Sequence, residues 1–263
     1  MALELIPLHT RRRLKIWLYN LRTKDPNRRI RVRRNGSVTE LSIGNEHIAL
    51  ASIGRWSKYR QGVRAQLQRL ARRYGVLGLE KAIAGGTVID VGANIGELGL
   101  FCSALGCRVL AIEPDPINFD ALTANARGTS IEPANLALWD TETELTFYSA
   151  VARADSSLIK PADFERSFAV RTKTLDAFAA ESGIDRVVLL KMDAEGAEPE
   201  VLRGGRETLL RTRFVTIDCG PERMGERTFD ACRDILQGLG FDTQAVDAAG
   251  NVLFAENLAY PAA

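Results

Sequence analysis

The stretch Val88-Ile89-Asp90-Val91-Gly92-Ala93-Asn94-Ile95-Gly96 decides the fold of this 263-residue chain. Its first four residues predict a buried strand, its glycines predict a tight turn, and the residues after Gly96 predict a helix. A strand, a glycine turn and the start of a helix bring the backbone close to a nucleotide at the carboxyl end of a sheet. The stretch therefore predicts a nucleotide-binding α/β domain.

Strands and helices alternate from this stretch onwards, which favours a parallel sheet. Two strands around a turn at 249–251 follow the last helix, so we expect one antiparallel strand near the C-terminus. Such a strand is usual in the Rossmann-like sheets of class I methyltransferases and absent from the standard dinucleotide fold. The strands are expected at 87–91, 108–112, 136–138, 187–192 and 214–217, with an edge strand at 144–149, and the helices at 96–105, 116–126, 198–210 and 228–240.

The charge of the chain is divided unevenly, although the net charge is only +2. Residues 1–82 hold 19 Lys and Arg against 5 Asp and Glu, whereas residues 83–263 hold 16 against 28. We therefore expect a basic N-terminal extension over 1–82, with a helix at 11–22, a hairpin at 30–50 and a helix at 61–74, and the nucleotide-binding domain over 83–263. The extension either meets an anionic partner or packs on its own acidic domain or on a second subunit of a homo-oligomer.

The helix expected at 11–22 is basic and amphipathic. Its apolar residues recur at helical spacing among Arg and Lys, and they are Leu14, Trp17, Leu18 and Leu21. Such a helix suits contact with an anionic membrane surface. The alternative is that the apolar face docks against the rest of the chain.

The remaining composition is that of a soluble globular protein, with 46% apolar and 26% charged residues. No segment reaches the roughly 18 apolar residues of a membrane-spanning helix, and the N-terminus lacks the basic-then-apolar order of a secretory signal. The cysteines fit no zinc or disulfide spacing, which favours reduced thiols. We therefore expect a cytoplasmic protein, with membrane association only through the helix at 11–22.

The glycine turn discriminates between two cofactors. A dinucleotide fingerprint that starts at Gly92 needs two further glycines, where this chain has Asn94 and Glu97. A pyrophosphate would also lie beside the negative Asp90, whereas S-adenosylmethionine (SAM) carries no phosphate and offers an ammonium that Asp90 can hold. The sequence therefore favours SAM, bound by Asp90, Gly92, Asn94 and Gly96.

Two further acidic residues are candidates for binding the cofactor. Glu113 follows the second strand, where a carboxylate accepts hydrogen bonds from both ribose hydroxyls, a device that NAD enzymes share. Asp140 ends the expected third strand, where adenine should lie, and either its side chain or a nearby backbone amide would bind that base. We therefore expect Glu113 at the ribose and Asp140 at the adenine.

Charged residues crowd the mouth of the sheet after the strand at 187–192. Methyl transfer is an in-line displacement at the sulfonium methyl, so the protein must align an oxygen nucleophile and accept its proton. We expect Asp193 to be the base, with Lys191 and Glu195 as catalytic neighbours that adjust its charge state.

Two other roles remain open for these carboxylates. Asp193, Glu195 and Glu198, with Asp218 at the end of the next strand, offer the oxygen ligands that Mg²⁺ prefers. The lack of a nearby His argues against zinc. The same residues also suit the N-terminus of the following helix, where negative charge is favourable. The sequence therefore leaves base, Mg²⁺ ligand and helix cap as roles for Asp193.

Five short motifs between residues 85 and 220 occur together in one known family. They are DVGANIG (90–96), AIEPD (111–115), NLALWD (135–140), TLD (174–176) and LKMDAEGAE (190–198). In these motifs the chain resembles the FkbM family of SAM-dependent methyltransferases. The resemblance implies O-methylation of a hydroxyl, commonly on a sugar of a surface glycan or glycolipid, or on a natural-product macrocycle.

The resemblance also gives expectations for single residues. It implies a supporting role for Asp176 and a position facing the substrate for Ser156-Ser157. Many members carry Glu where this chain has Asp218, which weakens any role assigned there. Residues 1–82 lie outside the motifs, so we expect substrate choice to be decided in that segment.

Two other classes of function are compatible with parts of this sequence. An NAD-dependent oxidoreductase would share much of the fold, but Asn94 and Glu97 argue against it, as does the lack of a suitable His or Tyr at the mouth of the sheet. An RNA-directed methyltransferase would use the basic extension, but the arginines there lie in no recognisable RNA-binding motif. We therefore expect a small-molecule or glycan acceptor, with a nucleic-acid-directed methyltransferase as the alternative.

Overall fold

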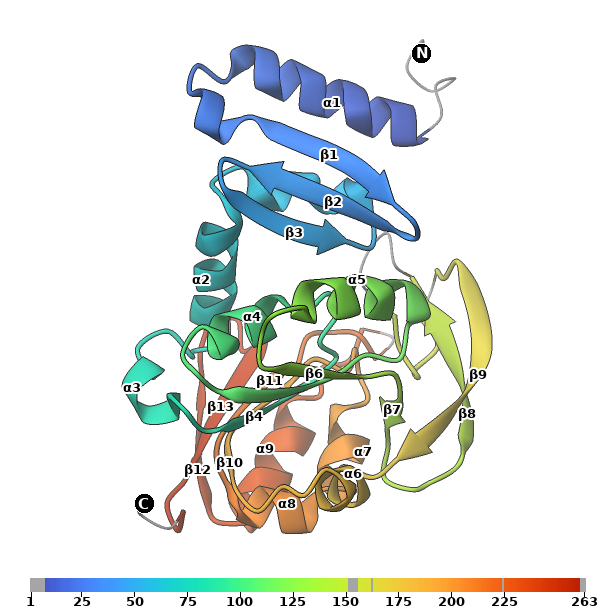
Figure 1. Cartoon of the computed structure of the whole chain (residues 1–263). Helices are drawn as coiled ribbons and strands as arrows, with labels where there is room; N and C mark the ends of the chain where they lie inside the picture. The colour runs from blue at the N-terminus through green and yellow to red at the C-terminus, as the bar shows by residue number, and fades with distance from the viewer. Residues whose placement is uncertain (1–7, 151–155, 162, 224, 261–263) are drawn as a thin grey trace.

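A seven-stranded sheet forms the centre of the structure, a computed structural model that describes residues 8–150, 156–161, 163–223 and 225–260 (Figure 1). Its strands lie in the spatial order β12-β13-β11-β10-β4-β5-β6. Their bounds are β4 Thr87–Val91, β5 Arg108–Ile112, β6 Ile131–Ala134, β10 Val187–Met192, β11 Thr212–Asp218, β12 Phe241–Ala245 and β13 Val252–Asn257. The central strands are nearly continuous apolar runs because both faces of the sheet are covered.

The sheet is parallel except at its C-terminal end. The pairs β6–β5, β5–β4, β4–β10 and β10–β11 are parallel, whereas β13 pairs antiparallel with both β11 and β12. The predicted class I methyltransferase sheet, with one antiparallel strand near the C-terminus, is therefore confirmed. Strand order reverses between β4 and β10, so their carboxyl ends lie at a topological switch point, where open α/β sheets bind ligands.

Helices cover both faces of the sheet and form two apolar cores. On one face α6, α7, α8 and α9 pack on side chains such as Leu190 and Val215. On the other face α2, α3, α4 and α5 pack on side chains such as Val109 and Leu189. Their bounds are α2 Val63–Arg73, α3 Glu80–Ile83, α4 Glu97–Ser103, α5 Pro116–Ala126, α6 Leu175–Glu181, α7 Glu198–Arg203, α8 Arg206–Leu210 and α9 Phe229–Gly238. Since α2 belongs to the expected extension, this core runs across the boundary expected at residue 82.

The N-terminal segment forms an outer layer over α5 (Figure 1). The helix, hairpin and second helix expected there are present, and a third strand extends the hairpin. The elements before α2 are α1 Leu8–Arg22, η1 Pro26–Arg28, β1 Ile30–Asn35, β2 Val38–Ile43, β3 Glu46–Leu50 and η2 Ile53–Tyr59, where η marks a 3-10 helix.

Apolar packing and paired hydrogen bonds attach this layer to the main domain. Ile16 of α1 and Trp56 of η2 are buried in one cluster with Ala121 of α5. The Asn125 side chain on α5 accepts from the Ala49 amide at 2.7 Å and donates to the Ala49 carbonyl at 2.9 Å. The layer is therefore fixed on the domain, and α1 docks through the face that carries Ile16.

The third strand of the sheet differs from the prediction. The strand beside β5 is β6, not the segment 136–138. Residues Ala137–Leu138 form β7, which joins β9 Arg166–Lys173 and β8 Glu144–Ser149 in a separate small sheet. Pro133 lies inside β6, which is tolerated because β6 is the edge strand and its outer amides need no partner strand.

The prediction of a single helix over 198–210 is also wrong, because α7 and α8 are separate helices. A Cβ on Gly204 would lie 2.5 Å from the Trp139 carbonyl oxygen, and a Cβ on Gly205 would lie 2.6 Å from a methyl of Leu175. The two glycines thus let the neighbouring backbone and side chain approach where a continuous helix would exclude them. Among the described helices, none is both long and apolar enough to cross a membrane.

Candidate active site

A cavity of about 290 Å³ opens at the carboxyl ends of β4, β5, β10 and β11. An acidic residue within one position of the carboxyl end of each strand lines the cavity, and these residues are Asp90, Glu113, Asp193 and Asp218. The second wall comes from η2 and α2 of the N-terminal segment, with Arg55, Lys58, Arg73 and Tyr74. The switch point between β4 and β10 therefore brings these four acidic residues to one cavity.

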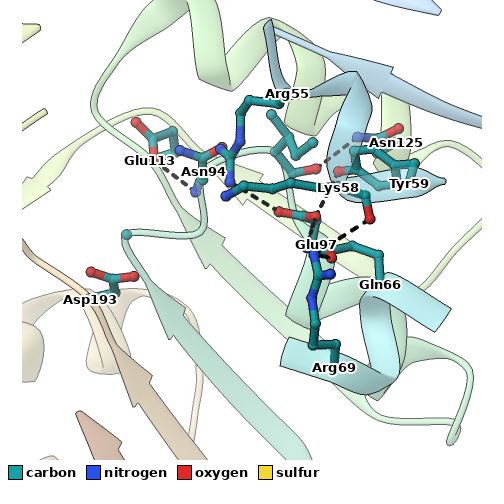
Figure 2. Close-up of polar contacts among 12 residues, drawn as sticks. Arg55, Lys58, Tyr59, Gln66, Arg69, Asn94, Glu97, Glu113, Asn125 and Asp193 are labelled. Atoms are coloured by element: carbon teal, nitrogen blue, oxygen red, sulfur yellow. Dashed lines mark hydrogen bonds and ion pairs between the residues drawn. The ribbon is translucent and has the colours of Figure 1, made fainter. Parts of the chain in front are cut away.

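The glycine turn is held against the loop that follows β10. Gly92 has φ +67°, and a Cβ there would lie 1.8 Å from the Asp193 carbonyl oxygen, so a larger residue cannot occupy the position. Asn94, at φ 52°, donates its backbone N–H to Glu113 Oε2 at 2.8 Å and accepts from Arg55 at 2.7 Å (Figure 2). Gly96 does not line the cavity; it caps α4, where a Cβ would meet Leu122 at 2.7 Å. The turn therefore brings Gly92 and Asn94 to the cavity and leaves Gly96 behind them.

Asp90 and Lys191 form a buried ion pair beneath the cavity, with 3.1 Å between Lys191 Nζ and Asp90 Oδ1. Lys191 Nζ also donates to the carbonyls of Gly92 at 2.8 Å and Val91 at 3.2 Å. Burial alone would lower the pKa of Lys191, but the carboxylates of Asp90 and Asp193 outweigh it and raise that pKa. Lys191 is therefore a charged group that holds the turn.

The Asp90 carboxylate is incompletely satisfied. It is 1% exposed, and among the described residues neither oxygen has a donor in good hydrogen-bond geometry, although Lys191 lies close. A buried carboxylate that lacks donors is costly unless a ligand completes its shell. The residues present therefore fit a cationic ligand group at this point, such as the ammonium of SAM.

Glu113 is buried at the end of β5 and organises the turn as well as lining the cavity. It accepts the backbone N–H of Asn94 at 2.8 Å and that of Asp115 at 2.9 Å. Burial raises the pKa of Glu113 to about 8, against the hydrogen bonds that favour its ionised form. Its predicted position at the ribose is compatible with this placement at the cavity wall.

A tyrosine that no sequence motif indicated holds the candidate base. Tyr74 follows α2 and donates its hydroxyl to Asp193 Oδ2 at 2.7 Å. Burial and the Asp193 carboxylate raise the pKa of Tyr74 well above its usual value, so the phenol remains a donor. Arg73, its neighbour in sequence, pairs with Asp218 at the end of the adjacent strand β11. Asp193 is therefore fixed at the mouth through a residue 119 positions away in the chain.

The other two carboxylates after β10, Glu195 and Glu198, differ in position and in role. Glu195, at φ 51°, lines the cavity, and its carbonyl accepts the Ser157 hydroxyl at 2.7 Å. Glu198 points away from the cavity and accepts the backbone N–H groups of Ala194 at 2.9 Å and Gly196 at 3.0 Å. Helix and loop capping, one of the roles left open by the sequence, is therefore the role of Glu198.

The proposed Mg²⁺ ligands are dispersed. Glu198 is engaged with backbone amides, and Asp218 is paired with Arg73. Within the described ranges, no group of three or more His, Cys, Asp or Glu side chains is placed to hold a metal ion. The donor set thus gives the Mg²⁺ interpretation no support.

Asp140 and Asp176 also lie outside the cavity, as Gly96 and Glu198 do. Asp140 does not line it and instead lies 3.9 Å from Arg203, whereas residues 136–138 supply an apolar wall. Asp176 accepts the backbone N–H of Thr208 at 2.7 Å and so caps α8. Of the expected pair Ser156-Ser157, Ser156 lines the cavity, whereas Ser157 is buried outside it and donates its hydroxyl to the Glu195 carbonyl.

A buried polar cluster joins the N-terminal segment to the start of α4 (Figure 2). Glu97 accepts from the Tyr59 hydroxyl at 2.6 Å and from Gln66 at 2.9 Å, and it lies 3.6 Å from the Arg55 guanidinium. Lys58 extends along this cluster to the cavity, and burial followed by the charge of Arg55 lowers its pKa. The expected extension thus builds the cationic wall beside the glycine turn.

Comparison with known proteins identifies the family of the chain. The sequence profile described as the methyltransferase FkbM domain matches residues 90–243. The hexuronic acid methyltransferase AglP of Haloferax volcanii is 32% identical over 143 residues, which span 53% of this chain and 58% of that protein. The 2-O-methyltransferase NoeI of Sinorhizobium fredii is 35% identical over 75 residues, which span 28% of this chain and 31% of that protein. The matches thus cover about half, or less, of these curated relatives.

Solved structures of methyltransferases are similar to this chain only at low sequence identity and low TM-score. A TehB-like SAM-dependent methyltransferase from Corynebacterium glutamicum has a TM-score of 0.37 and 14% identity, over 73% of this chain and 97% of that chain. A SAM-dependent methyltransferase from Aquifex aeolicus has a TM-score of 0.39 and 13% identity, over 73% and 95%. The family profile, which covers more than half of the sequence, settles the identity: the chain belongs to the FkbM family of SAM-dependent methyltransferases.

Proposed function

We propose that this methyltransferase transfers the SAM methyl group to a hydroxyl oxygen of a sugar or glycan. The observation that carries the proposal is the carboxylate of Asp193, held by Tyr74 at the mouth of the cavity that Asp90 and Glu113 also line. The names of AglP and NoeI, a hexuronic acid methyltransferase and a 2-O-methyltransferase, support a sugar as the acceptor.

The residues that would hold SAM come from three parts of the chain. Asp90 would accept from the ammonium, and Glu113 from the ribose hydroxyls. Arg55 and Lys58 line the wall beside the turn and would hold the carboxylate. The apolar residues 136–138 would contact the adenine, in place of the Asp140 side chain.

When bound, SAM would supply the methyl group. The attacking oxygen would bond to the methyl carbon, and the sulfonium sulfur would leave as a neutral thioether. Asp193 accepts the proton of the acceptor hydroxyl as the new O–CH₃ bond forms. Tyr74 occupies Asp193 Oδ2, which leaves Oδ1 for this proton. Lys191 holds the glycine turn and Asp90 in place without contacting the acceptor, so its role is positioning.

Measurements of cofactor binding and of turnover test the cofactor site and the catalytic base separately. S-adenosylhomocysteine binding, measured by calorimetry, should be retained in Asp193→Asn, whereas its production from SAM with sugar acceptors should fall by at least about a hundredfold. The matched control is Asp242→Asn, an exposed carboxylate on β12 that should change neither quantity. The compounds to be assayed as acceptors are neutral glycosides, hexuronides and, as a test of the nucleic-acid alternative, an RNA transcript.

Three results would overturn the proposal. Turnover with RNA and not with sugars would favour the nucleic-acid alternative. Full activity in Asp193→Asn would remove Asp193 as the base. Failure of the wild-type chain to bind S-adenosylhomocysteine would mean that the cavity is not the cofactor site.

A further inference from the structure

The outward face of α1 carries a stripe of exposed apolar side chains. Leu14 is 37% exposed, Trp17 55%, Leu18 40% and Leu21 63%. Among the described residues the other large exposed apolar side chains, Phe164, Leu210 and Leu258, lie on other parts of the chain. A contiguous apolar stripe marks an interaction surface, whereas single exposed residues need no explanation.

The inner face of α1 is already occupied, so the stripe cannot turn inwards. Ile16 is buried, and the Tyr19 ring lies 5.6 Å from that of Trp56. Asn20 donates to the Ile30 carbonyl and accepts the Ile30 amide, both at 2.8 Å. These contacts fix the rotation of α1 about its axis and hold the apolar stripe towards the outside.

Positive charge flanks the stripe on both sides. On the helix, Arg13 lies on one side of the stripe, and Lys15 and Arg22 lie on the other, all three exposed. The sequence of α1 contains no acidic residue. On β1, the strand beneath, further exposed arginines follow, namely Arg31, Arg33 and Arg34. The surface is therefore apolar along its ridge and cationic at its edges.

We propose that α1 is a membrane-surface helix, which lies on the interface of an anionic lipid bilayer with Trp17 and the three leucines in the headgroup layer. An apolar face between cationic edges is the pattern of such interfacial helices, and Trp favours that depth. The three-stranded sheet separates α1 from α5 of the α/β domain (Figure 1), so α1 lies at the outer surface of the N-terminal layer. The proposal does not depend on the acceptor.

A second copy of the chain fits this surface less well. A twofold contact between two α1 helices would bring the same cationic edges together, which is unfavourable. The stripe also lies along the exposed side of a single helix, which is a convex surface. Anionic lipid complements both the charge and the shape.

The experiment is flotation of the full chain with vesicles of phosphatidylcholine, with and without phosphatidylglycerol. Binding should require phosphatidylglycerol and should weaken at high salt. The combined variant Leu14→Ser, Trp17→Ser, Leu18→Ser and Leu21→Ser should lose affinity on the order of a hundredfold. The combined variant Leu210→Ser and Leu258→Ser, which removes exposed apolar residues elsewhere, should bind as the wild type does.

A charge variant tests the proposal a second way. Changing Arg13, Lys15 and Arg22 to Gln should weaken binding to phosphatidylglycerol vesicles about fivefold per residue. S-adenosylhomocysteine binding should stay unchanged in all variants, which shows that the fold is intact. The proposal is overturned if the wild type does not float with anionic vesicles, if the stripe variant floats equally, or if the stripe instead mediates a dimer that the serine variant dissociates.

Discussion

Tyr74 is the residue on which the geometry of the base depends. Its hydroxyl donates to Asp193 at 2.7 Å, and hydrogen bonds to a carboxylate favour the ionised form that accepts protons. In Tyr74→Phe we expect kcat to fall about tenfold with the KM for SAM unchanged. Tyr148→Phe, which removes a hydroxyl from β8, serves as the control, and a Tyr74→Phe variant with unchanged kcat, or with a KM for SAM that rises as much as kcat falls, would contradict a positioning role.

Glu113 links the protonation of the site to cofactor binding. Burial raises its pKa to about 8, so the carboxyl is mostly protonated at neutral pH in the cofactor-free protein. Hydroxyl donors and the positive charge of SAM favour the carboxylate, so binding should release a proton, and affinity should rise as pH increases towards 8. Calorimetry in two buffers of different ionisation enthalpy measures the protons released.

The variant Glu113→Gln gives the matched comparison for this release. It keeps the size of the side chain and removes its titration, so proton release should fall and SAM affinity should drop about tenfold or more. Asp218, with a pKa raised to about 6 by burial and by Asp193, lies in the same cavity and should account for a smaller remainder. Equal proton release in both proteins would assign the titration to another group.

Among the elements, the junction of α7 and α8 shows how close packing divides a helix. A Cβ on Gly204 would lie 2.5 Å from the Trp139 carbonyl oxygen, which is backbone and cannot move aside cheaply. Gly204→Ala should therefore lower the free energy of unfolding by about 1–3 kcal/mol. Gly238→Ala, at the end of α9 with open space around it, should be neutral or stabilising by up to about 1 kcal/mol. Urea unfolding compares the two, and equal effects would contradict the packing argument.

The elements also show which parts of the fold are encoded locally. The strand over 187–192 and the helix over 116–126 were predicted with the bounds that they have, because apolar runs and helix caps are local signals. The strand β6 was missed because it is four residues long and contains Pro133, which only its edge position permits. The break after α7 falls at Gly204-Gly205, a glycine pair that is a local signal for a helix end, and the contact with Trp139 that requires it is far away in sequence.

At the scale of the molecule, one part of the candidate site is predicted by local sequence signals, and the other part depends on packing between distant segments. Asp90, Glu113 and Asp193 were predicted to lie together because each ends a parallel strand, and they line one cavity. Arg55 and Tyr74 were not predicted, because the packing of η2 and α2 alone brings them to that cavity. The N-terminal segment therefore has two roles in one layer: its inner side completes the site, and its outer helix presents the apolar stripe.

The burial of carboxyl groups across the molecule also predicts how its stability depends on pH. Burial raises the pKa of Glu113 to about 8 and that of Glu198 to about 7, whereas in the unfolded chain both titrate near 4.5. Between pH 4.5 and these values the folded protein binds more protons than the unfolded one. The free energy of unfolding should therefore fall as pH rises, by at most about 1.4 kcal/mol per pH unit for each group.

Urea unfolding of the cofactor-free protein at several pH values from mildly acidic to mildly alkaline measures this slope. Glu198→Gln keeps an acceptor for the amides of Ala194 and Gly196 and removes one of the two titrations. The variant should be less stable than the wild type at acidic pH, yet its stability should decline less steeply as pH rises. Stability that increases with pH in the wild type would show that these carboxyls are ionised in the folded state, with the cost of their burial offset by the donors around them.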